Sequence, residues 1–216
     1  MRKLNIKEFG LRCVSNFPQP RPYSESVVVD FISAALREFS SYGIAAPNFK
    51  KNEGDKLFSY LISISLFNGN VLVELNAFGV VAFFSAGQTE RDADIIMEVL
   101  GKVHRCISES EKLGHTVAPF CHAEFADGKG SESFFKALPF QGNAKPVAFG
   151  VMSDEPAEAM LPSNKRLRMD IAPSETINDG VFLSWVFSVS GVLTADHTKA
   201  MLPKIKALAA SIGIDV

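Results

Sequence analysis

The segment 121–124 carries the residue types best suited to chemistry in this sequence. His122 and Glu124 stand two residues apart within Cys-His-Ala-Glu. Residues with this spacing on a β-strand project to the same side. An imidazole beside a carboxylate suits metal ligation, or a general base with its orienting partner. His122 and Glu124 are therefore the catalytic candidates of the sequence.

The same segment also fits the solvated face of a half-buried strand. The alternating residues on the other side are more apolar, which turns His122 and Glu124 outward. Two ligands do not make a structural zinc site, and the Pro-Cys-x-x-Cys part of the zinc-deaminase motif does not occur. We therefore expect the pair to face solvent, and we predict no metal and no cofactor. The more apolar side consists of Val117, Pro119, Cys121, Ala123 and Phe125.

Other local motifs for catalysis are incomplete or missing. Residues 127–131 resemble part of a phosphate loop, but the first glycine is missing and no Ser or Thr follows Lys129. The chain has no CxxC, HExxH or GxSxG motif and no dinucleotide fingerprint. These absences lean against an enzyme, although they leave a dispersed active site open.

The remaining thiols and imidazoles do not suggest a ligand set. His104 and Cys106 are two residues apart on a predicted helix, so they point in different directions. The 3 cysteines lack the paired spacing of a disulfide framework or a zinc ribbon. We read all of them as free thiols, which predicts a reducing, cytoplasmic location.

A ligand pocket is the alternative that explains the aromatic composition. The chain has 18 Phe but only 1 Trp and 3 Tyr. Phenylalanine supplies large apolar surface without a polar group, which suits a core or an apolar cavity. If a Phe-lined pocket lies between a curved sheet and the helices, Asp170 and Trp185 are candidate lining residues, together with His122 and Glu124.

Charge patterns favour a protein partner over nucleic acid. Lys and Arg number 22 and Asp and Glu 24, which gives a net charge of −2 and no general attraction to phosphate. A basic strip lies close in sequence to an acidic loop, and such neighbours suggest an electrostatically steered docking surface. The partner would be another protein or a second copy of this chain. The strip is Lys165, Arg166 and Arg168, and the loop carries Asp154, Glu155 and Glu158.

Hydrophobic periodicity predicts the elements that position these residues. A helical period indicates three long helices, over residues 24–42, 90–113 and 195–212. A period of two from Leu57 to Phe84 predicts a meander with a type I′ turn at Asn68-Gly69. Serines and this turn also make the charge-free run 57–73 a hairpin and not a membrane span. Further strands are expected at 116–125, 147–152, 167–171 and 181–189.

The predicted fold is a single α+β domain over residues 1–216, with mainly antiparallel sheet packed against the helices. Thr89 and Thr194 each follow an apolar strand and open a helix, so halves 1–114 and 115–216 suggest a duplication, with chance similarity the alternative. The largely buried positions should include Ile62, Ile64, Val73, Val99, Val103, Phe187, Val189 and Ile205.

Two functions follow as hypotheses. The first is a non-catalytic protein-interaction module such as an inhibitor, immunity factor or adaptor, because catalytic motifs are missing and several strands could offer a sheet edge. The alternative is a small-molecule binder or enzyme built around the Phe-lined pocket.

Overall fold

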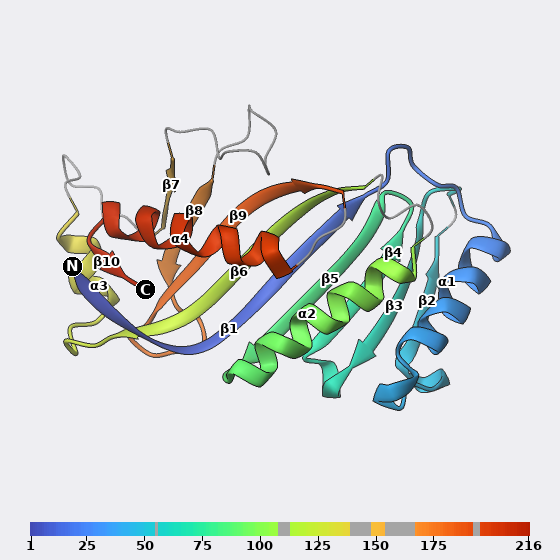
Figure 1. The fold of residues 1–216 in the computed structure, drawn as a ribbon, viewed down its shortest axis with the longest axis horizontal. Helices are drawn as coiled ribbons and strands as arrows, with labels where there is room; N and C mark the ends of the chain where they lie inside the picture. Colours follow the sequence, from blue (N-terminus) through green and yellow to red (C-terminus); the bar gives the residue numbers. More distant parts are fainter. Residues whose placement is uncertain (55, 108–112, 139–147, 154–166, 192–194) are drawn as a thin grey trace. The chain divides into compact units, whose positions relative to one another are not determined.

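The computed structural model describes residues 1–54, 56–107, 113–138, 148–153, 167–191 and 195–216 (Figure 1). The described chain contains ten strands and four α-helices. In chain order they are β1 (Arg2–Asn16), α1 (Glu25–Glu38), β2 (Phe49–Glu53), β3 (Tyr60–Leu66), β4 (Val71–Asn76), β5 (Gly79–Gly87), α2 (Glu90–Arg105), β6 (Gly114–Phe125), α3 (Ser131–Lys136), β7 (Phe149–Met152), β8 (Arg168–Pro173), β9 (Val181–Ser190), α4 (Ala195–Ser211) and β10 (Ile214–Asp215).

The chain folds into two compact units, and each is discontinuous in sequence. Unit 1 comprises Met1–Gly10, Ala118–Phe187 and Asp196–Val216, and unit 2 comprises Leu11–Val117 and Ser188–Ala195. The strands β1, β6 and β9 contribute residues to both units.

Unit 2 is a sheet with helices packed on it. Its strands follow the order β2-β3-β4-β5-β1, and the pairs of the β3–β5 meander are antiparallel, with Val73 opposite both Ile64 and Ala82. Helix α2 packs against β5 and against α1 (Figure 1). Every second residue of β3 and β4 is buried, because alternate side chains of a strand face the core.

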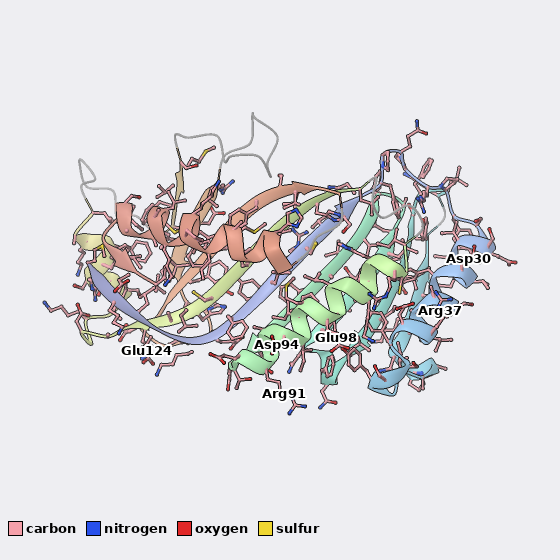
Figure 2. The ribbon with its side chains drawn as sticks, viewed as in Figure 1. Asp30, Arg37, Arg91, Asp94, Glu98 and Glu124 are labelled. Carbon is pink, nitrogen blue, oxygen red and sulfur yellow. The ribbon has the colours of Figure 1, made fainter. Side chains whose placement is uncertain are left out.

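Helix α2 is amphipathic, which fixes the side that faces the strands. Arg91, Asp94 and Glu98 recur at helical spacing, are exposed and form its charged side (Figure 2). The opposite side is buried and consists of Ile96, Val99, Leu100, Val103 and His104. A histidine thus occupies a position that helical periodicity reserves for core residues.

Unit 1 contains a second antiparallel meander. Its strands follow the order β6-β9-β8-β7, and Ile171 of β8 pairs with Phe149 of β7 and Leu183 of β9. The short strand β10 pairs in parallel with the start of β1, where Arg2 lies opposite Ile214. Helix α4 buries Met201, Leu208 and Ala209.

The structure confirms the mixed α+β class with a large, mainly antiparallel sheet. Of the predicted core, seven residues are at most 2% exposed, but Ile205 is only half-buried. The neighbouring Leu202 is 53% exposed, whereas Met201 and Leu208 are buried, so the buried side of α4 is narrower than the periodicity predicts. The reason is weak amphipathicity, since apolar residues occur around most of this helix.

Two local predictions were wrong, and one strand was missed. Gly114 does not end a helix but begins β6, and α2 already ends at Arg105. The β3–β4 connection is longer than a two-residue type I′ turn, since residues 67–70 separate the pair Leu66 and Val71. Strand β1 was not predicted, because charged residues interrupt its apolar alternation. No helix within the described ranges is long and apolar enough to span a membrane.

Candidate metal centre

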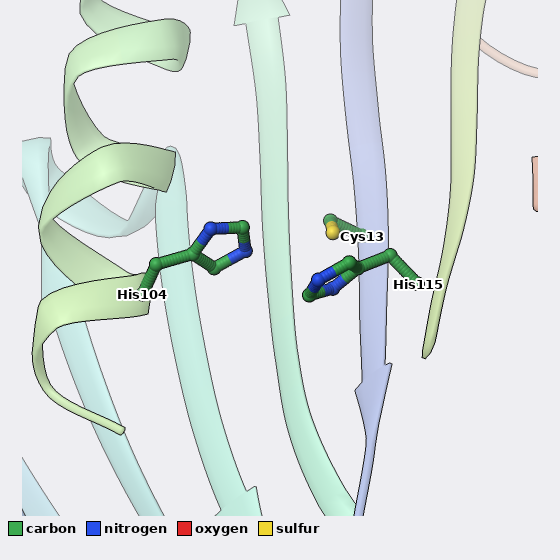
Figure 3. A group of neighbouring side chains, drawn as sticks. All are labelled: Cys13, His104 and His115. Carbon is green, nitrogen blue, oxygen red and sulfur yellow. The ribbon is translucent and has the colours of Figure 1, made fainter. Parts of the chain in front are cut away.

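Three potential metal ligands from three elements meet inside unit 2. They are Cys13 of β1, His104 of α2 and His115 of β6 (Figure 3). One ligand atom from each side chain lies within 4.8 Å of the other two. Thiolate and imidazole are the side chains that bind zinc and copper ions in proteins.

The two strands present their ligands through ordinary alternation. In β1, Leu11, Cys13 and Ser15 are buried, whereas Arg12 is exposed. Cys13 and Ser15 therefore face the same side of the strand. His115 is the second residue of β6 and is only 2% exposed.

Two features of helix α2 determine where His104 lies: the residue at which the helix begins and the side of the helix that is buried. Thr89 accepts a hydrogen bond from the Asp92 amide at 3.3 Å, and the Asp92 carboxylate accepts one from the Thr89 amide at 2.8 Å. This reciprocal cap fixes where the helix begins. His104 then lies in the last turn on the same side as Leu100 and is 4% exposed.

Ser15 orients the His115 ring. The Nδ1 atom of His115 lies 2.8 Å from the Ser15 hydroxyl oxygen, and both side chains are buried. When that oxygen accepts the Nδ1 hydrogen, the lone pair of the neutral ring is at Nε2. Metal-binding histidines are commonly held in this way by a hydrogen bond from their other nitrogen.

The His104 ring is buried, but its nitrogens lack the hydrogen bonds that buried polar groups normally make. Its ring stacks on His115 with centroids 4.6 Å apart and planes inclined by 27°. Neither nitrogen of His104 has a hydrogen-bond partner among the residues that the structure describes. An unsatisfied buried polar group costs about 1–3 kcal/mol. Burial, and secondarily His115, lowers the pKa of His104 to about 4, so the ring is neutral at pH 7.

Cys13 is a protonated thiol at neutral pH. Burial raises its pKa to about 11, and the Ser15 hydroxyl, 4.0 Å from the sulfur, opposes this effect in part. Metal binding would therefore release the thiol proton, which makes the affinity depend on pH.

The catalytic candidates of the sequence lie elsewhere, in unit 1. His122 and Glu124 lie on one side of β6 and are half-exposed. Cys121 and Ala123, which alternate with them, are buried on the other side. The Nδ1 atom of His122 lies 2.9 Å from the Ser174 hydroxyl. Glu124 pairs with Lys7 at 3.1 Å. Each residue thus has a partner of its own, and a catalytic role for the pair stays a prediction.

The predicted pocket residues Asp170 and Trp185 face opposite sides of the sheet. In the register of β8 and β9, Met169 pairs with Trp185 and Asp170 with Ser184. Trp185 is 4% exposed on the same side as buried Met169, whereas Asp170 is half-exposed and bonded to Arg168. The register of these strands therefore gives no support to a pocket lined by both residues.

A small hollow does adjoin two phenylalanines of unit 2. It has a volume of about 110 Å³ and lies between Phe67, Phe84 and Ile96. Pockets for small organic ligands typically measure about 300–1,000 Å³. Neither Asp170 nor Trp185 lines this hollow, and the Phe-lined ligand pocket stays a prediction.

The predicted partner surface is mostly beyond the described residues. Asp154, Glu155, Glu158, Lys165 and Arg166 all lie outside them. Arg168 is exposed at the start of β8 and pairs with Asp170 at 2.7 Å. Docking through this strip stays a prediction.

Sequence reasoning missed the cluster because it judged each residue alone. Cys13 was interpreted as a free thiol, and it is one. His104 was compared only with Cys106, its neighbour in sequence. The signal available in the sequence was hydrophobic periodicity. His104 occupies a position on the apolar side of α2, and Cys13 alternates with the charged Arg12 in β1.

Comparison with known proteins does not identify a family. No protein-family model matches the sequence, and a search of curated proteins finds no match. The functional argument therefore depends on the geometry of the cluster.

Proposed function

We propose that this protein binds one transition-metal ion through Cys13, His104 and His115. The observation that carries the proposal is the His104 ring, which is buried beside a thiol and a second imidazole without a hydrogen-bond partner in the described chain. A metal ion would replace the missing hydrogen bond with a coordinate bond. The donor set suits zinc or copper.

Coordination requires only a local rearrangement. Bonds of roughly 2.0–2.3 Å to nitrogen and sulfur place the donors of a trigonal site about 3.5–3.8 Å apart. The present atoms are within 4.8 Å, so an inward shift of about 1 Å suffices. His104 is the ring that would rotate out of the stack, because it has no hydrogen bond to lose within the described chain, whereas Ser15 holds His115.

The bound ion would link α2 to two strands that are distant in sequence. Because the three ligands meet only in the folded chain, the metal would bind the native state selectively. Free metal at about 100 times its dissociation constant then adds roughly 2.7 kcal/mol to the free energy of unfolding. We therefore expect the ion to stabilise unit 2 in addition to any chemistry that it supplies.

Metal titration of the full chain tests the proposal. The purified protein is stripped with a chelator and titrated with Co²⁺, Zn²⁺ and Cu⁺, the last under anaerobic conditions. We expect one ion per chain, a thiolate-to-metal charge-transfer band with Co²⁺, and loss of both in Cys13→Ala and His104→Leu.

The matched controls are a second buried thiol and a histidine outside the cluster. Cys121→Ala and His122→Ala should bind metal as the wild type does. Circular dichroism and thermal melting of every variant separate loss of a ligand from loss of the fold. Binding that persists in Cys13→Ala and His104→Leu, or absence of stoichiometric binding in the folded wild type, would contradict the proposal.

We also propose that residues 1–114 and 115–216 are related by an internal duplication, which lets the position of His104 be compared with its counterpart in the second half. Its support is the order strand, helix, antiparallel strands, helix, which occurs as β1-α1-β2-β3-β4-β5-α2 and, with one strand fewer among the described residues, as β6-α3-β7-β8-β9-α4. Ala209 stands as far after Thr194 as His104 stands after Thr89, and it is fully buried. On this alignment, a small apolar residue fills the equivalent helix position, so packing alone does not require a histidine there.

A further inference from the structure

We propose that the ion held by Cys13, His104 and His115 is monovalent copper, Cu⁺. This inference rests on the proposed function and specifies its ligand. The first step is charge balance. One thiolate and two neutral imidazoles carry a total charge of −1, so Cu⁺ gives a neutral site, whereas Zn²⁺ or Cu²⁺ leaves a net positive charge.

The surroundings penalise charge of either sign. All three donors are buried, with at most 4% of each residue exposed. Burial of this depth disfavours a net charge of either sign, because the charged form loses its hydration. No Asp or Glu of the described chain joins the cluster to balance a surplus positive charge. A neutral metal site therefore suits these surroundings best.

The number of donors points the same way. Zinc sites are almost always four-coordinate, with a fourth protein ligand or a water molecule. No fourth Cys, His, Asp or Glu joins the cluster within the residues that the structure describes. The Ser15 hydroxyl beside the cluster is a neutral oxygen that already bonds His115.

Copper in its monovalent state suits such a site. A soft thiolate donor binds Cu⁺ as well as zinc, but Cu⁺ accepts three donors without requiring a water molecule. The buried, apolar setting also favours the lower charge of Cu⁺ over Cu²⁺. Figure 3 shows the His104 side chain extending from α2 toward Cys13 and His115, and rotation of the His104 ring would let the three donors surround one ion.

Competition between chelators decides between the metals. The full chain, free of metal and under anaerobic conditions, is titrated with Cu⁺ against the chromogenic chelator bathocuproine disulfonate. A parallel titration uses Zn²⁺ against a chromogenic zinc chelator. We expect one Cu⁺ per chain, release of one proton per ion, and Zn²⁺ binding at least 100-fold weaker. X-ray absorption should show two nitrogens and one sulfur around copper.

The variants and the alternative metals separate the two proposals. Cys13→Ala and His104→Leu should each weaken Cu⁺ binding at least 100-fold, while Cys121→Ala and His122→Ala should leave it unchanged. Tighter binding of Zn²⁺ through the same residues, or a stable Cu²⁺ form with an electron paramagnetic resonance signal and intense thiolate absorption, would overturn the assignment to Cu⁺ and leave metal binding intact. Failure of every metal to bind the folded wild type would overturn both proposals.

Discussion

Acid should destabilise the metal-free protein through His104. In the folded chain this ring is buried and neutral, and its pKa is about 4. In the unfolded chain water surrounds the ring, and its pKa is near the ordinary histidine value of 6.5. Below pH 6.5 the unfolded state therefore binds a proton that the folded state excludes until about pH 4.

The pKa difference sets both the sign and the size of the effect. A group whose folded pKa is lowered gives stability that is complete above its unfolded pKa and declines as the pH falls. The loss begins near pH 6.5, is complete near pH 4, and totals about 3 kcal/mol at 1.36 kcal/mol per pKa unit. That loss is a large fraction of the ~5–15 kcal/mol by which a typical domain is stable.

Urea unfolding at several pH values measures this loss. Chelator-treated wild type and His104→Leu are unfolded at pH 7, 6, 5 and 4, and the free energies of unfolding are compared at each pH. Carboxylates titrate in both proteins, so their contribution cancels in the difference. The wild type should lose about 3 kcal/mol more than His104→Leu between pH 7 and pH 4, and His122→Ala should follow the wild type.

Parallel pH profiles of wild type and His104→Leu would refute this reasoning. They would mean that the His104 ring has the same proton affinity in both states, so it is either solvated or hydrogen-bonded in the folded protein. A profile in which only the wild type is destabilised by acid supports the buried, neutral ring.

Three further predictions concern the scaffold of the site, and urea unfolding measures each. A Cβ at Gly79 would lie 2.0 Å from the Ser15 carbonyl oxygen, so Gly79→Ala should push β5 away from β1 and lower the free energy of unfolding by at least about 2 kcal/mol. Gly114→Ala is the control, because a Cβ at Gly114 meets open space. Equal losses of stability in the two variants would contradict the clash. Thr89→Ala removes the α2 cap and should cost about 1 kcal/mol, whereas an unchanged midpoint would show that the cap is dispensable. Ile64→Ala should cost about 2–5 kcal/mol, because Ile64 is fully buried, and a loss below about 1 kcal/mol would mean that the core collapses around the gap.

Several parts of the fold could be predicted because their signals are local. The alternation in β3 and β4 identifies the buried residues Ile62, Ile64 and Val73 directly. Thr89 marks the start of α2 because its hydroxyl accepts a bond from an amide three residues later. These features depend on the backbone period and on neighbours in sequence. Predictions failed where local signals were mixed, as in charged β1 and in α4 around Ile205.

The sequence by itself determined which sides of the elements are apolar, and therefore the α+β class. It also placed His104 within a helix, whereas the charged residues of β1 concealed the strand that carries Cys13. Only the tertiary structure decided that these residues meet His115, because periodicity specifies the buried side of an element but not the residue opposite it. Strand register and helix docking, which result from packing between distant segments, brought the thiol and two imidazoles within 4.8 Å of one another.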